Sequence, residues 1–138
     1  MKIQRIIDLL PNYKSSYSRK DVLVSKLNGT WNPIGIDEFI SASDDLSFGL
    51  MFEGVGPGDK VAIISSNCPE WNIADFAIAQ IGAISVPIYP TMSAGDTEFI
   101  LKDADVKIAF VLDRELYSKV ESIKNTLPEL KSVYTFKK

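Results

Sequence analysis

The sequence contains no histidine and a single cysteine, Cys68, among its 138 residues. Without histidine, Ser-His-Asp triads, histidine general bases and histidine-containing zinc sites are all excluded. One cysteine supports neither an intramolecular disulfide nor a cysteine metal cluster. These absences remove several classes of active site, and they favour a reducing compartment. We therefore expect a cytoplasmic protein.

Long apolar runs and an excess of positive charge are also missing. No stretch approaches the ~20 apolar residues of a membrane span, and Asp8 interrupts the Ile6-Ile7 pair before a signal-peptide core develops. The chain has 15 Lys and Arg against 18 Asp and Glu, a net charge of −3. Phosphate backbones are bound by clustered basic side chains. We therefore expect no nucleic-acid partner.

The composition that remains is that of a globular protein, with 46% hydrophobic and 24% charged residues. A folded domain of this size removes roughly two-thirds of its unfolded surface from water. A hydrophobic core can therefore form without disulfides or a structural metal. The sequence shows no internal repeat or linker, and we expect residues 1–138 to form a single domain.

The first quarter of the sequence predicts a short helix followed by a β-hairpin. Apolar residues recur at helical spacing in residues 1–14 until Pro11; they are Ile3, Ile6, Ile7 and Leu10. Residues 22–27 and 30–34 then flank Asn28-Gly29, the dipeptide that best tolerates the two positive φ angles of a type I′ turn.

A longer helix is predicted from Asp37, as the N-cap, to the region of Gly54, as a C-terminal glycine cap. Its apolar face consists of Phe39, Ala42 with Ser43, Leu46 and Leu50. The glycine-rich run that follows, residues 54–59, predicts a tight turn into a strand.

Beyond residue 59, short apolar segments rich in β-branched and aromatic residues alternate with helical patterns. The expected strands are residues 60–65, 83–89, 106–112 and 132–136. Nearly continuous apolar strands joined by helices are typical of a parallel sheet covered on both faces. The predicted fold class is therefore α/β: a parallel sheet with helical crossovers on both faces, preceded by an N-terminal helix and a β-hairpin.

The ends of the crossover helices are recognisable in the sequence. The first helix begins with either Asn67 or Cys68 as its cap, and the sequence leaves both alternatives open. Ser93 is a cap-like residue for the second helix. The third runs from about Asp113 and ends near Pro128, with Leu116, Val120, Ile123 and Leu127 on its apolar face.

Parallel α/β domains bind ligands at the carboxyl ends of their strands, so we expect function in the loops after Ser65, Tyr89 and Leu112. The first of these loops, residues 65–69, has no glycine to let the backbone approach a pyrophosphate closely. The glycine-rich run 54–59 precedes a strand instead of opening a helix. We therefore interpret it as a structural turn and not as a phosphate loop.

Few other residues are candidates for chemistry. Cys68 at a helix N-terminus is a candidate nucleophile, but no base is predicted beside it, and a partly buried cap residue is the favoured interpretation. The acidic pairs Asp44-Asp45 and Asp103/Asp105 are candidate metal ligands or acid/base groups. Both pairs lie within or at the end of helical segments, where a solvated surface explains them.

A set of ordered motifs in the middle of the chain resembles the N-terminal part of long-chain fatty-acid–CoA ligases, members of the adenylate-forming superfamily. The matching segments are Gly54-Val55-Gly56-Pro57-Gly58-Asp59-Lys60-Val61-Ala62-Ile63, Asn67-Cys68-Pro69-Glu70-Trp71, Gly82-Ala83-Ile84-Ser85-Val86-Pro87-Ile88-Tyr89-Pro90-Thr91 and Phe99-Ile100-Leu101. The resemblance implies that residues 1–138 are the N-terminal subdomain of an adenylate-forming enzyme. In that context Gly82 would permit close helix–strand approach, and Pro87 and Pro90 would bend the chain out of the sheet.

The resemblance also implies what the parent enzyme does. It would activate a carboxylic acid with Mg·ATP to an acyl-adenylate and pyrophosphate, and then transfer the acyl group to the thiol of coenzyme A. The residues that bind ATP, Mg²⁺ and coenzyme A lie downstream of the matched region in this family. For residues 1–138 the resemblance therefore implies no catalytic, cofactor-binding or metal-binding residue and no cofactor of their own.

Two hypotheses follow. In the first, the chain is an N-terminal fragment of an ATP-dependent long-chain fatty-acid–CoA ligase, with no catalysis of its own. Its partners would be the remainder of the parent chain and a fatty acid, and peripheral association of the parent with a membrane is compatible with it. In the second, the chain is a stand-alone α/β binding or interaction module with a ligase-like fold. Under the first, we expect an exposed apolar face and self-association through it.

Overall fold

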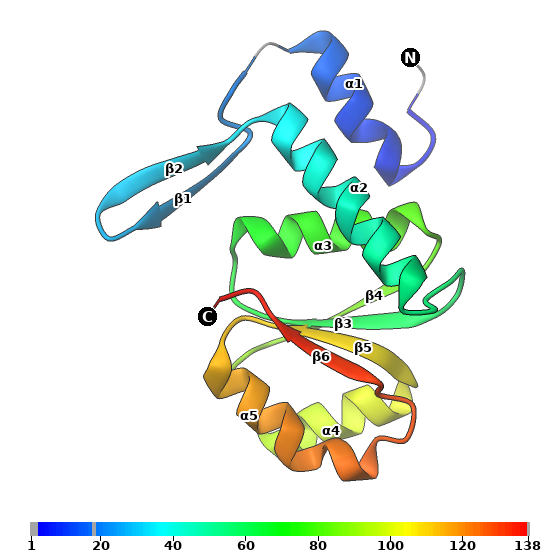
Figure 1. The fold of residues 1–138 in the computed structure, drawn as a ribbon. Coiled ribbons are helices and arrows are strands. Elements are labelled where there is room, and N and C mark those ends of the chain that lie inside the picture. The colour runs from blue at the N-terminus through cyan, green and yellow to red at the C-terminus, as the bar shows by residue number, and fades with distance from the viewer. Residues whose placement is uncertain (1–2, 18, 138) are drawn as a thin grey trace.

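The computed structural model describes residues 3–17 and 19–137, so the first two positions of the predicted N-terminal helix, together with residues 18 and 138, lie outside the described residues. Figure 1 shows helices stacked on both faces of a central sheet, with a hairpin at one side. The α/β class predicted from the sequence is confirmed. In the described part of the chain, no helix combines the length and the apolar character needed to cross a bilayer.

The central sheet has four parallel strands in the order β4-β3-β5-β6. These strands are β3 (Lys60–Ile64), β4 (Ile84–Ile88), β5 (Val106–Val111) and β6 (Ser132–Thr135). The two central strands, β3 and β5, are almost entirely buried, as expected for apolar strands covered on both faces. All four strands lie within the segments that the sequence predicts.

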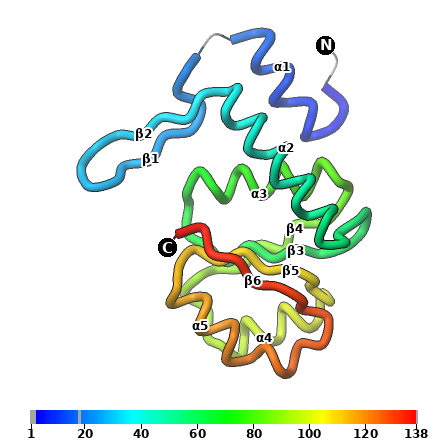
Figure 2. The backbone as a smooth tube through the Cα atoms, viewed as in Figure 1, coloured from blue at the N-terminus to red at the C-terminus, as the bar shows by residue number. Residues whose placement is uncertain are grey.

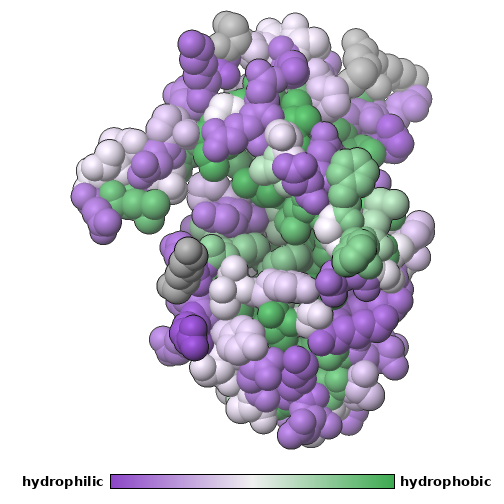
Figure 3. All heavy atoms as spheres, in the orientation of Figure 1, coloured by the Kyte–Doolittle hydropathy of each residue, from purple (hydrophilic) through white to green (hydrophobic). Residues whose placement is uncertain are grey.

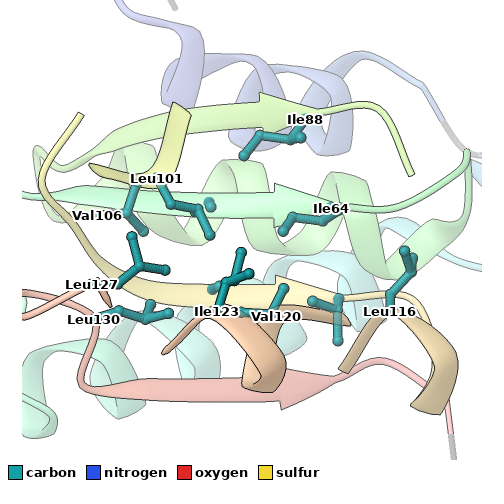
Figure 4. Close-up of a cluster of buried hydrophobic side chains, with 12 residues drawn as sticks. Ile64, Ile88, Leu101, Val106, Leu116, Val120, Ile123, Leu127 and Leu130 are labelled. Carbon is teal, nitrogen blue, oxygen red and sulfur yellow. The ribbon is translucent and has the colours of Figure 1, made fainter. Parts of the chain in front are cut away.

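Helices α4 (Ala94–Asp103) and α5 (Arg114–Ile123) cover one face of the sheet, and the 3₁₀ turn η2 (Lys124–Thr126) follows α5. Figure 4 shows the core cluster that they form with the sheet. It includes Ile64, Ile88, Leu101, Val106, Leu116, Val120, Ile123, Leu127 and Leu130. The whole predicted apolar face of the third crossover helix is buried here.

Helices α2 (Ile36–Phe52) and α3 (Pro69–Gln80) cover the opposite face. The two helices approach closely because small residues meet: the Ser47 hydroxyl donates to the carbonyl oxygen of Ala77 over 3.1 Å, and Ser43 is fully buried. Leu50 of α2 joins the cluster formed by α3, β3 and β5. The core thus continues across the sheet, with one cluster on each face.

The N-terminal elements pack outside this layer. The hairpin strands β1 (Leu23–Leu27) and β2 (Thr30–Ile34) pair antiparallel, and Asn28 and Gly29 have φ of 49° and 82°, as the turn prediction requires. Figure 2 shows the hairpin projecting from the body of the molecule. Helix α1 (Leu9–Ser16), preceded by the 3₁₀ turn η1 (Ile6–Asp8), lies against α2.

Two helix boundaries predicted from the sequence are wrong. Pro11 does not stop the N-terminal helix. It lies in the first turn of α1, where backbone N–H groups have no intrahelical acceptor, so the N–H that proline lacks costs no hydrogen bond. The N-cap of α2 is Gly35 and not Asp37. Asp37 instead lies in the first turn, where the helix dipole favours a carboxylate, and its Oδ1 is 2.6 Å from Lys14 Nζ.

The structure decides the alternatives at α3. Cys68 is the N-cap and Pro69 occupies the first helical position. At the other end Gly82 has φ of 72°, and a Cβ there would lie 3.3 Å from the Cβ of Pro57. Gly82 therefore permits close approach to the turn before β3, not the helix–strand approach that the resemblance implies. Pro87 lies inside β4, an edge strand, and does not bend the chain out of the sheet.

Candidate functional site

The loops after β3, β4 and β5 lie together at the carboxyl edge of the sheet, where the sequence predicts function. Pairing continues one step beyond the strands: the Leu112 amide donates to the carbonyl oxygen of Ile64 over 3.0 Å, and the Lys137 amide donates to that of Leu112 over 3.0 Å. These backbone hydrogen bonds hold the loop starts in register. The edge therefore presents the starts of these loops in a fixed arrangement.

Three surface cavities open along this edge. The largest, of about 470 Å³, lies between hairpin strand β1 and the loop that enters α3; Asn67, Cys68, Glu70 and Lys137 are among its lining residues. A cavity of about 240 Å³ joins the ends of β3 and β4 and is lined by Ser65, Asn67, Trp71, Pro87, Ile88 and Tyr89. A third, also about 240 Å³, is lined by Arg114, Tyr117, Thr135 and Lys137.

Cys68 lies at this edge but is not activated as a nucleophile. Burial raises the pKa of the Cys68 thiol, and the hydroxyl of Ser65, 3.5 Å from the sulfur, acts in the opposite direction with a smaller effect. A raised pKa leaves the thiol protonated near neutral pH, whereas nucleophilic attack requires the thiolate. As the sequence interpretation favours, Cys68 is a partly buried cap residue.

Glu70, in the first turn of α3, has one enclosed carboxylate oxygen. Its Oε2 is shielded from solvent and has no hydrogen-bond partner among the described residues. The side chain does not complete a capping box, the alternative in which Asn67 caps the helix, because Cys68 takes the cap position. The carboxylate adds a hydrogen-bond acceptor to the lining of the largest cavity.

The acidic pairs are not brought to this edge. Asp44 and Asp45 are exposed on α2, where Asp44 Oδ1 accepts a hydrogen bond from Gln80 Nε2 over 2.9 Å. Asp103 and Asp105 are exposed at the end of α4, next to the amino end of β5. Within residues 3–17 and 19–137, no three His, Cys, Asp or Glu side chains converge as metal ligands do.

The glycine-rich run 54–59 lies at the amino end of β3, the edge opposite the cavities. Two of its amides form hydrogen bonds within the protein. Gly56 N–H donates to Asp59 Oδ2 over 2.9 Å, and Gly58 N–H donates to the carbonyl oxygen of Gly82 over 2.9 Å. Gly54 and Gly58 have φ of 81° and 82°, which only glycine adopts readily. The run is a structural turn, as its position before a strand predicts.

The same turn carries an ion pair that should make stability depend on pH. Lys107 Nζ lies 2.8 Å from Asp59 Oδ1, and its hydrogen bond is the main cause that holds the pKa of Asp59 below the usual 3.8. A lowered carboxyl pKa contributes stability above the unfolded-state pKa and loses it as the pH falls through the folded-state value. Acidification from about pH 6 to about pH 3 should therefore narrow the difference in unfolding free energy between the wild-type chain and Lys107→Met.

Urea unfolding at several pH values measures this difference. The matched control is Lys102→Met, at an exposed lysine of α4, for which no such narrowing is expected. Parallel pH profiles for the wild-type chain and the Lys107 variant would contradict a role for the pair.

One residue that matters for the edge was missed by the sequence analysis. Lys119 Nζ, from α5, donates to the carbonyl oxygens of Pro90 and Met92, at 2.9 Å each. It therefore fixes the loop between β4 and α4 at the carboxyl edge. Its position on the polar side of an amphipathic helix carries no signal of this role, because the contact depends on how α5 packs beside a loop 27 to 29 residues away.

The edge supplies groups for binding more than groups for catalysis. Arg114 and Lys137 offer positive charge, while Asn67, Tyr89 and the Glu70 carboxylate offer hydrogen-bonding groups. Cys68 is the nucleophile that the sequence offered at this edge, and burial raises the pKa of its thiol, which keeps the thiol protonated near neutral pH. This arrangement suits a surface that orients a ligand, while the protein groups that react with the ligand lie elsewhere.

Comparisons with known proteins match most of this chain. A family model described as "AMP-binding enzyme" matches residues 14–137. The chain is 33% identical over 107 residues to the long-chain-fatty-acid–CoA ligase FadD15 of Mycobacterium bovis, covering 78% of this chain and 18% of that protein. It is 30% identical over 106 residues to the long-chain-fatty-acid–CoA ligase heimdall of Drosophila melanogaster, covering 77% of this chain and 16% of that protein.

Solved structures agree in fold. The chain superposes with a TM-score of 0.83 on a putative long-chain-fatty-acid CoA ligase from Rhodopseudomonas palustris, at 23% identity, covering 96% of this chain and 33% of that one. It superposes with a TM-score of 0.80 on a fatty acyl CoA synthetase from Mycobacterium tuberculosis, at 19% identity, covering 95% of this chain and 26% of that one. At these identities the likeness establishes the fold alone.

Proposed function

The chain belongs to the AMP-binding enzyme family, and from this premise we propose that it is the N-terminal part of an ATP-dependent long-chain fatty-acid–CoA ligase. The observation that carries the proposal is the match of the family model to residues 14–137. The relatives that are named long-chain-fatty-acid–CoA ligases support the substrate class. The chain spans only 18% of the length of the first of them, so the activity proposed is that of a longer protein.

The proposed chemistry has two steps. A fatty-acid carboxylate attacks the α-phosphorus of ATP, which forms an acyl-adenylate and releases pyrophosphate. The thiol of coenzyme A then attacks the acyl carbon, which forms the thioester and releases AMP. Mg²⁺ would neutralise phosphate charge in the first step. We assign no Mg²⁺ ligand and no catalytic residue to this chain, because the proposal places these residues in the part of the ligase outside the matched 18%.

The proposed role of this chain is to build and orient one wall of the ligase. The parallel sheet sets the carboxyl edge, Lys119 holds the loop after β4, and Asp113 caps the helix after β5 by accepting from the Leu116 amide over 3.1 Å. A rigid wall of this kind lowers the entropic cost of aligning reactants. The proposal requires that the reacting groups come from the rest of the ligase.

A stand-alone binding module is the second candidate, and one observation favours it. The largest cavity, of about 470 Å³, lies between elements of this chain, with the apolar and polar residues of β1 on one wall and the α3 entrance on the other. Its size is that of a small-ligand pocket. The coding sequence beyond Lys138 discriminates the two: a Ser/Thr/Gly-rich phosphate loop supports the ligase, and a stop codon supports the module.

Location and partners are part of the same proposal. A single free cysteine fits a cytoplasmic protein. A fatty acid is the proposed substrate of the ligase, and peripheral association of the ligase with a membrane is compatible with an acyl substrate. The net charge of −3, without a basic cluster, continues to favour the absence of a nucleic-acid partner.

Purified residues 1–138 are expected to fold and yet to show no exchange of pyrophosphate into ATP that depends on a fatty acid. The reason is that the proposed function places the ATP-binding groups outside this chain. The measurement is isotope exchange with saturated fatty acids of several lengths, after circular dichroism has shown a folded chain. Intact FadD15 of Mycobacterium tuberculosis serves as the positive control. Pyrophosphate exchange that requires fatty acid and persists after further purification would contradict the proposal that the ATP-binding groups lie outside this chain.

A further inference from the structure

The projecting hairpin of β1 and β2 has two different faces. At its base Leu23 pairs with Ile34, and both side chains pack, partly buried, against the hydrophobic cluster between α1 and α2. Successive side chains of a strand point to opposite faces of a sheet. The alternate pairs therefore lie on the other face of the hairpin. These pairs are Val24 with Pro33 and Lys26 with Trp31. We call these four residues the hairpin face.

The hairpin face exposes apolar side chains. Trp31 is 65% exposed and Val24 is 46% exposed, and Pro33 is exposed as well. The pair between them on the packed side, Ser25 with Asn32, is polar. A hairpin that packs on one face usually places its polar residues on the solvated face, so this pattern is reversed. Figure 3 shows apolar side chains on the hairpin, at the left of the view, beside hydrophilic ones.

The hairpin face also carries a positive charge next to its largest ring. Lys26 Nζ lies 5.3 Å from the centroid of the Trp31 ring, within the range of a cation–π contact. Lysine is depleted in the buried centres of protein interfaces. At a membrane surface, in contrast, tryptophan rings lie at the level of the headgroups and lysine stems extend toward them. The combination favours a lipid surface over a protein as the partner.

The distribution of charge along the chain indicates which lipid surface fits. Residues 1–36 contain six Lys and Arg against two Asp, a net charge of +4, and residues 37–138 contain nine against sixteen, a net charge of −7. Figure 1 shows α1 and the hairpin on the α2 side of the sheet, and α4 and α5 on the other side. An anionic surface would therefore attract the end of the molecule that carries the hairpin and repel the other end.

Not all of this positive charge is free to act. Arg5, Lys14 and Arg19 each form an ion pair with a nearby Asp side chain. Lys20 and Lys26 are exposed and form no ion pair within the described ranges. Both lie in or directly before the hairpin, so they are close enough to a surface in contact with the hairpin face to act within a Debye length of about 8 Å.

We propose that the hairpin face docks on an anionic lipid surface. Trp31 and Val24 would lie at the boundary between headgroups and acyl chains, and Lys20 and Lys26 would face the lipid phosphates. Because only a few apolar side chains enter the boundary, the binding is weak and reversible. The inference goes beyond the proposed function and does not depend on it, since it rests on the hairpin and its charges.

The test measures binding of residues 1–138 to lipid vesicles by cosedimentation. One set of vesicles contains equal parts of phosphatidylglycerol and phosphatidylcholine, and the other contains phosphatidylcholine alone. Trp31→Ser is the hairpin variant, because a side chain that is 65% exposed contributes little to folding. Phe99→Ser is the matched control, since Phe99 is 69% exposed on α4, on the far side of the sheet. Circular dichroism checks that each variant is folded.

The wild-type chain and Phe99→Ser should bind the anionic vesicles equally, and Trp31→Ser should bind about tenfold more weakly, because it loses the burial of an aromatic ring. Binding should weaken as salt is added and should be weaker to phosphatidylcholine alone. The proposal is overturned if the wild-type chain does not bind the anionic vesicles, if both variants lose binding equally, or if the two kinds of vesicle are bound equally.

A second measurement places the ring directly. Trp71→Phe leaves Trp31 as the single tryptophan of the chain. Lipids with brominated acyl chains should then quench Trp31 fluorescence in anionic vesicles, with a shift of emission to shorter wavelength. Binding without quenching would assign the contact to another surface and overturn the proposal. A shift that appears without vesicles and grows with protein concentration would assign the hairpin face to a second copy of the chain, and would also overturn it.

The docking surface and the proposed function fail separately. Neither vesicle measurement involves ATP or a fatty acid. Absence of vesicle binding therefore overturns the docking surface and leaves the ligase proposal in place. A stop codon directly after Lys138 counts against the ligase and leaves the docking surface in place, because the hairpin face lies wholly within this chain.

Discussion

Replacing Phe110 with alanine is expected to lower the free energy of unfolding by about 3–5 kcal/mol, the range for truncating a buried aromatic side chain. Phe110 is only 6% exposed on β5, and its ring stacks on that of Phe136 with centroids 5.7 Å apart and planes 9° apart. The ring also contacts Tyr134. Its removal leaves a cavity beneath the end of α2 and removes the aromatic contacts that hold the last strand.

Urea denaturation measures the loss, and amide hydrogen exchange locates it. We expect the amides of β6 to lose protection from exchange first, because the ring of Phe110 contacts the rings of Tyr134 and Phe136. Phe99→Ala, at an exposed position on α4, should stay within about 0.5 kcal/mol of the wild-type chain. If the Phe110 variant unfolds at the same urea concentration as the wild-type chain, the aromatic stack does not stabilise the fold.

Replacing Ile63 with alanine is expected to cost about 2–5 kcal/mol, as for other large-to-small changes in a core. Ile63 is 0% exposed on β3, between Pro87 of β4 and Phe110 of β5 in the register of the sheet. Its side chain belongs to the cluster beneath α2 and α3. The neighbouring strands are constrained by their pairing and cannot close the cavity fully.

Thermal and urea unfolding of the Ile63 variant test this expectation. Ile84→Ala is the control, because Ile84 lies in the same sheet with half of its side chain exposed and should have a much smaller effect. An equal loss in both variants would show that the position in the sheet, and not burial, decides the cost. Because Ile63 and Phe110 are partners across the sheet, their effects should not add when the two changes are combined.

Local chemistry made several parts of the fold predictable. The hairpin follows from Asn28-Gly29, whose positive φ angles suit the turn, and the end of α2 follows from Gly54. The Ser93 side chain caps its helix as predicted, accepting from the amide of Asp96. The helix predicted from about Asp113 begins there, and the Asp113 side chain accepts from the amide of Leu116. In each case the determining interactions lie within a few residues, so the sequence contains the whole signal.

The errors have the opposite character. Pro11 and Asp37 each have two acceptable positions at a helix start, and local preference does not choose between them. Tertiary contacts determine where these helices begin and end: Leu10 is buried against α2, and Asp37 pairs with Lys14 of α1. At the candidate site the sequence predicted which loops meet. It did not predict the cavity beside the hairpin, or the two carbonyl oxygens that Lys119 holds.

The sequence by itself determined the α/β class, the order of strands and helices, and membership of the AMP-binding family, because periodicity, turn residues and ordered motifs are written along the chain. It also excluded from these 138 residues every site that needs a histidine. Only the tertiary structure decided that the turn at residues 54–59 lies at the edge of the sheet opposite the three cavities, and that an apolar groove lies between Phe52 of α2 and Tyr134 of β6. These features depend on which surfaces the packing of helices against the sheet covers and leaves bare. Contacts between residues far apart in the chain decide which surfaces are covered, and a local sequence pattern contains no information on these contacts.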